Sequence, residues 1–94
     1  MKHIEWNKDK NELLKEERDI SFEEVADTII NQKVLDTFNH PNQKKYPGQK
    51  VFVVEINDYA YFVAYAEDDN KYFLKTVYPD SNLTKKYLKK GNKK

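Results

Sequence analysis

Three runs rich in β-branched and aromatic residues follow one another in the second half of the chain, and they constrain the fold most strongly. They span residues 51–56, 59–66 and 72–78. Asn57-Asp58, a pair that tolerates left-handed backbone geometry, separates the first two runs, and residues 68–70 separate the last two. Such runs joined by tight turns are typical of adjacent antiparallel strands. The sequence therefore predicts an antiparallel sheet of about three strands.

The opening of the chain predicts a strand followed by a helix. Residues 3–6 alternate in polarity, as a short half-buried strand does. Asn7 can then cap a helix over residues 8–17. Because its apolar residues are only Leu13 and Leu14, we expect this helix to be held by one narrow stripe and to be half exposed.

A second helix has the clearest local start signal in the sequence. Ser21 is followed three residues later by Glu24, a capping box in which each side chain bonds the other residue's backbone amide. Apolar residues then recur at helical spacing as far as about Lys33: Phe22, Val25, Ala26, Ile29 and Ile30. We expect these residues to form a continuous buried face.

The middle strand of the predicted sheet could turn either face towards the helices. One face carries Tyr59, Tyr61, Val63 and Tyr65, and the other carries Ala60, Phe62, Ala64 and Ala66. We expect Phe62 and its small neighbours to pack against the helices and the tyrosines to be partly exposed. Residues 39–50, with two prolines and no periodicity, are predicted to be a loop.

The end of the chain predicts one more helix. Pro79 ends the last strand, and Asp80 or Ser81 can cap a short amphipathic helix after it. Residues 91–94 are expected to fray. No repeat or boundary divides the sequence, so we predict a single α+β domain over residues 1–94. It would comprise two N-terminal helices packed on an antiparallel sheet of three to four strands, with a short C-terminal helix.

Composition excludes several classes of site. The chain has no cysteine, which rules out a disulfide framework, a thiolate metal site and a cysteine nucleophile. His3 and His40 are its only histidines, and they do not form a metal-binding pair, so neither a metal nor another cofactor is expected. No run approaches the roughly 18 apolar residues that span a bilayer, and the first residues do not read as a signal peptide. We expect a cytoplasmic protein that has no contact with membranes.

Charge is unevenly distributed along the chain, although the net charge is only +1. Residues 1–47 carry 8 basic and 10 acidic groups, whereas residues 70–94 carry 8 lysines and a single acidic residue, Asp80. A basic C-terminal end indicates phosphates or an acidic partner. The alternative is a solvated tail that keeps the protein soluble.

A group of polar residues is expected to gather on one side of the sheet. Its members are His40, Lys44, Lys45, Tyr46 and Lys50 from the loop, Lys75 and Tyr78 from the last strand, and Lys85 and Lys86 from the final helix. Lysines attract phosphate and can stabilise a developing negative charge, and tyrosines can stack on unpaired bases. The alternative is an ordinary sheet surface with exposed lysines and half-buried tyrosines.

Two short motifs carry a family resemblance. Ile4-Glu5-Trp6-Asn7 is followed by Lys10 and Asn11, and Ile20-Ser21-Phe22-Glu23-Glu24 then opens a helix. This pattern resembles the start of the BrnT family of toxins from bacterial type II toxin-antitoxin pairs. The expected order of three antiparallel strands and a terminal helix after Leu83-Thr84-Lys85-Lys86 is also similar, so the likeness spans nearly the whole chain.

The resemblance implies a RelE-like ribonuclease fold, metal-independent cleavage of RNA, and neutralisation by a small antitoxin encoded nearby, through which the toxin could oligomerise. By analogy, the 2′-hydroxyl would attack the adjacent phosphate. Lys75 matches the strand position that would carry a cation, and His40, Tyr78 or Lys50 could serve as acid or base. Contacts to RNA would come from Lys44, Lys45, Tyr46, Lys85 and Lys86.

The sequence also departs from the family pattern near its end. The family's last strand and final helix are usually rich in arginine, whereas Arg18 is the only arginine here. Lysine cannot clamp a phosphate with two parallel hydrogen bonds as arginine does. A second hypothesis is therefore a non-catalytic module on the same fold, whose tyrosine-bearing sheet and basic helix bind a partner protein.

Overall fold

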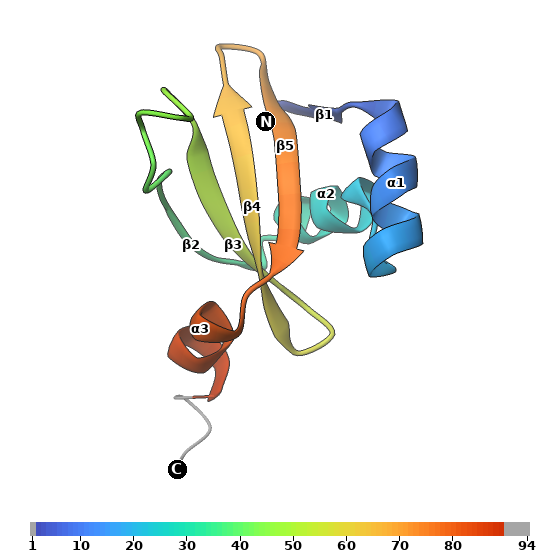
Figure 1. Ribbon diagram of the computed structural model, residues 1–94, viewed down its shortest axis with the longest axis vertical. Helices are drawn as coiled ribbons and strands as arrows, with labels where there is room; N and C mark the ends of the chain where they lie inside the picture. Colours follow the sequence, from blue (N-terminus) through green and yellow to red (C-terminus); the bar gives the residue numbers. More distant parts are fainter. Residues whose placement is uncertain (1, 90–94) are drawn as a thin grey trace.

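A five-stranded mixed sheet forms the centre of the fold (Figure 1). The computed structural model describes residues 2–89, so the expected fraying of residues 91–94 lies outside the described part. The strands are β1 (His3–Trp6), β2 (Val34–Asn39), β3 (Lys50–Ile56), β4 (Tyr59–Glu67) and β5 (Lys71–Pro79). Their order in the sheet is β1-β5-β4-β3-β2. β1 runs parallel to β5, and every other neighbouring pair is antiparallel.

The α+β class and the β3-β4-β5 meander agree with the sequence prediction, but the sheet is larger and is not purely antiparallel. β2 forms an edge strand against β3 that the three-strand prediction did not include. β1 adds a parallel strand at the other edge, with Ile4 opposite Tyr72. Four alternating residues indicate a strand without indicating its neighbour or direction. Pairing β1 with β5 brings together two segments that lie far apart in the sequence.

The helices begin where the sequence indicates. α1 (Lys8–Arg18) is capped by Asn7, and α2 (Phe22–Ile30) starts with the complete Ser21/Glu24 capping box. α3 (Ser81–Thr84) is capped by Asp80 and continues into a π-helical turn, η1 (Lys85–Lys89). No helix within residues 2–89 has both the length and the apolar character needed to cross a membrane.

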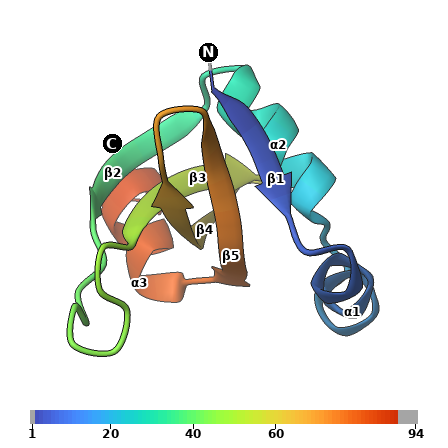
Figure 2. The ribbon, with the colours of Figure 1, turned by 90° about the horizontal axis from the view of Figure 1, so that it is seen from above.

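Two hydrophobic clusters lie on opposite faces of the sheet, and Figure 2 shows α1 and α2 on one side and α3 on the other. The first cluster joins α1 and α2 to the sheet through Leu14, Ile20, Phe22, Val25, Ile29, Phe52, Val54, Ile56, Val63, Tyr65, Leu74 and Val77. The second consists of Val51, Val53, Ala60, Phe62 and Ala64, against which Leu83, Tyr87 and Leu88 of the C-terminal helix pack.

The predicted orientation of β4 towards the N-terminal helices is therefore wrong. Val63 and Tyr65 face α1 and α2, and Tyr65 is buried. Phe62 lies on the opposite face, under the C-terminal helix. Alternation alone leaves the two faces equivalent, and the second face is buried because the C-terminal helix packs against it together with Leu35 and Phe38. Ile30 also departs from its prediction, because α2 ends there and the side chain is half exposed.

Two buried polar side chains hold the helices in place. Asn11 of α1 accepts a hydrogen bond from the Phe22 backbone N–H (2.8 Å) and donates to Glu23 (2.8 Å), so it ties α1 to the start of α2. Thr84 of α3 accepts from the Ala60 backbone N–H (2.9 Å) and donates to the Asp80 carbonyl (2.9 Å). Each of the two backbone amides is thereby satisfied inside the protein.

Candidate functional site

A β-bulge in β5 places two polar side chains beside each other. Ala64 pairs with Thr76 and Tyr65 pairs with Leu74, so Lys75 is the extra residue. Leu74 and Val77 point into the first hydrophobic cluster, whereas Lys75 and Thr76 line the same pocket on the opposite face. A bulge redirects side chains in this way and bends the strand locally.

The loop between β2 and β3 forms the other side of this pocket. Its ends are joined by the His40 N–H donating to the Gln49 carbonyl (2.9 Å). The Gln43 side-chain amide bridges the His40 and Gln49 carbonyls (2.8 and 3.0 Å). Gly48 sits at a φ of 78°, a conformation that favours glycine. These bonds fix the loop so that His40 and Tyr46 stand over the sheet.

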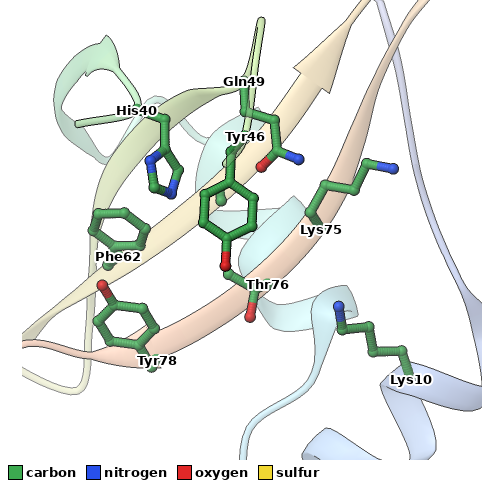
Figure 3. A pocket seen from close by; sticks show the side chains of 9 residues that line it. Lys10, His40, Tyr46, Gln49, Phe62, Lys75, Thr76 and Tyr78 are labelled. Atoms are coloured by element: carbon green, nitrogen blue, oxygen red, sulfur yellow. The ribbon is translucent and has the colours of Figure 1, made fainter. Parts of the chain in front are cut away.

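The resulting pocket has a volume of about 420 Å³ and opens on the sheet face opposite α2 (Figure 3). This volume lies within the range of small-molecule sites. The lining residues come from α1, the loop, β4 and β5: Lys10, His40, Tyr46, Gln49, Phe62, Ala64, Lys75, Thr76 and Tyr78.

Four rings, each in contact with the next, form one side of the pocket, which we call the aromatic wall: Tyr46, His40, Phe62 and Tyr78. The ring centroids of Tyr46 and His40 are 4.5 Å apart, and those of His40 and Phe62 are 5.6 Å apart in an edge-to-face arrangement. Phe62 and Tyr78 stack at 4.7 Å. Phe62 is buried while the other three rings are half exposed, so the wall offers aromatic surface to a ligand.

Positive charge lies across the pocket from His40 and Phe62. Lys10 and Lys75 occupy that side in Figure 3, where the Lys75 side chain extends away from the aromatic wall. The Lys75 ammonium rests over the Phe73 ring, 4.9 Å from its centroid, at the edge of the pocket. None of the lining residues is acidic, so the two ammonium groups have no carboxylate partner among them. The pocket is suited to an anion.

His40 and Tyr78 of the aromatic wall can both act as hydrogen-bond donors. The Asn42 backbone N–H donates to His40 Nδ1 (3.0 Å), so the neutral ring carries its proton on Nε2 and presents a donor there. Burial raises the pKa of the Tyr78 hydroxyl, with smaller contributions from Asp80 and Tyr46. Tyr78 therefore remains a neutral phenol at physiological pH.

The structure brings together four of the nine residues predicted for the site: His40, Tyr46, Lys75 and Tyr78. Lys50 does not reach the pocket. It shares the face of β3 that carries Phe52 and pairs with Glu67 (3.3 Å) on the other side of the sheet. The remaining predicted lysines are exposed and do not line the pocket: Lys44, Lys45, Lys85 and Lys86.

Sequence reasoning missed several lining residues, chiefly Lys10, Gln49 and Thr76. Lys10 belongs to the motif that carries the family resemblance, so the sequence did offer a signal for including it in the site. The same motif's Asn11 has a structural role between α1 and α2. No pattern marked Gln49 or Thr76, because their positions depend on the loop closure and on the bulge.

No group of three or more His, Cys, Asp or Glu side chains within residues 2–89 is placed to hold a metal ion. The sequence matches no protein-family model, and comparisons with curated proteins and with solved structures found no significant similarity.

Proposed function

We propose that this protein is a metal-independent endoribonuclease with a RelE-like fold, acting in the cytoplasm as the toxin of a toxin-antitoxin pair and neutralised by an antitoxin encoded nearby. The observation that carries the proposal is the pocket itself. Two lysines and a histidine N–H donor line a space that has an aromatic wall and no acidic residue. The BrnT-like motifs at residues 4–11 and 20–24 support the same function.

The chemistry is a transfer within the RNA strand. The 2′-oxygen attacks the adjacent phosphorus, the bond from phosphorus to the 5′-oxygen breaks, and the products end in a 2′,3′-cyclic phosphate and a 5′-hydroxyl. Negative charge accumulates on the phosphate oxygens in the transition state. Fixed donors and cations aimed at that charge lower the barrier.

Each pocket residue then has a role that follows from its environment. Lys10 and Lys75 stabilise the phosphate oxygens by charge, and His40 donates to one of them from Nε2. Tyr78, a neutral phenol, gives its proton to the departing 5′-oxygen and recovers it from water. His40 is not suited to take the proton of the 2′-hydroxyl, because an unprotonated Nε2 would place the ring's proton at Nδ1, against the Asn42 N–H. Hydroxide takes that proton.

Expression in a bacterial host, with and without the adjacent open reading frame, tests the proposal. We expect growth arrest and RNA decay that the neighbouring gene product relieves. Cleavage by the purified protein should persist in EDTA and fall about 100-fold or more in Lys75→Met. Lys50→Met is the matched control, because Lys50 lies on the opposite face of the sheet.

Two results would contradict this proposal. One is full cleavage by a folded Lys75→Met variant, which would remove the pocket from the chemistry. The other is intact RNA and normal growth at high expression of folded protein, which would favour the non-catalytic module.

A further inference from the structure

The pocket combines two features that a simple phosphate site does not need. A phosphate alone requires cations and N–H donors, which Lys10, Lys75 and His40 supply. The aromatic wall adds flat apolar surface on the other side, with Tyr46 and Tyr78 half exposed. A ligand that uses both sides carries a planar ring and an anionic group a short distance apart.

We propose that this pocket binds one unpaired nucleotide, with the base on the Tyr46 ring of the aromatic wall and the phosphate held by Lys10, Lys75 and His40. The inference rests on the proposed function and deepens it by naming what the site accepts. Bases stack on tyrosine rings with little dependence on sequence. The lysines supply the charge attraction that dominates binding to the phosphate backbone.

Gln49 adds a means of recognising the base edge. Its side-chain amide points into the pocket near Tyr46 in Figure 3, and it offers both a donor and an acceptor. A base lying on the Tyr46 side of the wall would present its polar edge to this amide. A plain aromatic phosphate has no such edge, and this separates a nucleotide from a phenyl phosphate as the ligand.

A paired base cannot use this site. In a duplex each base is stacked on its neighbours and bonded along its Watson–Crick edge, so neither its face nor that edge is available to the wall or to Gln49. The pocket should therefore take a free nucleotide or an unpaired one within a strand, and it should reject double-stranded RNA.

Binding of small probes to the full chain tests the ligand class. Titrations monitored by backbone amide NMR would compare adenosine monophosphate, inorganic phosphate, adenosine and phenyl phosphate. We expect adenosine monophosphate to bind most tightly. Tyr46→Leu should weaken its binding on the order of 5- to 150-fold and leave inorganic phosphate binding unchanged. Lys75→Met should weaken both, and Tyr46→Phe, which keeps the ring, should resemble the parent.

Two outcomes of these titrations would overturn the inference. The first is equal affinity for adenosine monophosphate and either inorganic phosphate or phenyl phosphate, which would show that the base contributes nothing. The second is unchanged nucleotide binding by Tyr46→Leu whose amide spectrum shows a folded protein, because the wall would then have no part in recognition.

A second pair of probes separates this inference from the proposed cleavage. A short 2′-O-methyl RNA cannot be cleaved, so its binding is measured independently of activity, as a single strand and as a duplex. Tight binding of the single strand alone, with no cleavage of ordinary RNA, would support the inference and refute the proposed function. Binding without preference for the single strand, alongside cleavage of ordinary RNA, would refute the inference and leave the function standing.

Discussion

Replacing Asn11 by alanine should destabilise the fold more than any exposed position on the same helix. The side chain is 3% exposed, and it satisfies the buried Phe22 N–H at 2.8 Å and donates to Glu23 at 2.8 Å. Leaving a buried N–H without a partner costs about 1–3 kcal/mol, and losing a second hydrogen bond adds roughly 1 kcal/mol. Alanine has a better helix propensity than asparagine, which offsets about 0.5 kcal/mol of this loss. The expected net loss is about 2–3 kcal/mol.

Urea denaturation followed by circular dichroism measures this loss directly, provided that the slope with denaturant is unchanged. For a domain of this size the same loss lowers the melting temperature by about 10–20 °C. Glu12→Ala is the matched control on α1. Its ion pair with Lys15 is exposed and 3.5 Å long, so the change should stay within about 0.5 kcal/mol.

Equal stability of Asn11→Ala and Glu12→Ala within error would refute this prediction. Such a result would mean that water or a shifted backbone satisfies the Phe22 N–H. Asn11→Asp refines the test, because it keeps the acceptor for Phe22 and replaces the donor to Glu23 with a like charge. Hydrogen bonding to Asn11 lowers the pKa of Glu23, so this variant should be more destabilised above the carboxyl titration range than below it.

Three further predictions follow from the same structure. Thr84→Val should cost about 1–3 kcal/mol in urea denaturation because the buried Ala60 N–H loses its acceptor, and Thr84→Ser should keep most of the stability. The hydrogen bond from Lys2 lowers the pKa of Glu67 in the folded state, so the stability from this pair is present above the unfolded pKa and is lost as pH falls through the folded value. Urea midpoints of the parent and Glu67→Gln should therefore differ at neutral pH and converge as the pH falls below the ordinary glutamate pKa. If RNA is cleaved as proposed, the rate should rise about tenfold per pH unit between roughly pH 6 and 8, because hydroxide is the base; a rate that levels off within this range would instead indicate a base supplied by the protein.

Features governed by neighbours in sequence were predictable. The Ser21/Glu24 capping box formed as expected, because both partners lie within one helical turn. Asn57 and Asp58 both adopt positive φ, 54° and 63°, a backbone conformation that asparagine and aspartate tolerate in tight hairpins. The meander of β3, β4 and β5 follows from three β-rich runs joined by such turns.

The site was only partly predictable, for a related reason. The prediction placed His40, Tyr46, Lys75 and Tyr78 on one side of the sheet. In a regular strand Lys75 and Tyr78 would face opposite sides, and only the bulge at Lys75 brings them to the same pocket. The prediction did not separate these residues from Lys50, whose face depends on the register of β3. A shift of one residue moves every side chain of a strand to the opposite face, and register is settled by packing on both faces at once.

The sequence by itself determined where helices and turns begin, the α+β class and the concentration of lysine near the C-terminal end, because these depend on local hydrogen bonding and composition. Only the tertiary structure decided that β1 joins β5 in parallel, that the C-terminal helix buries the Phe62 face, and that a bulge turns Lys75 into the pocket beside Lys10. Each of these outcomes depends on contacts between segments that are far apart in the sequence, and local hydrogen bonding and composition do not specify such contacts.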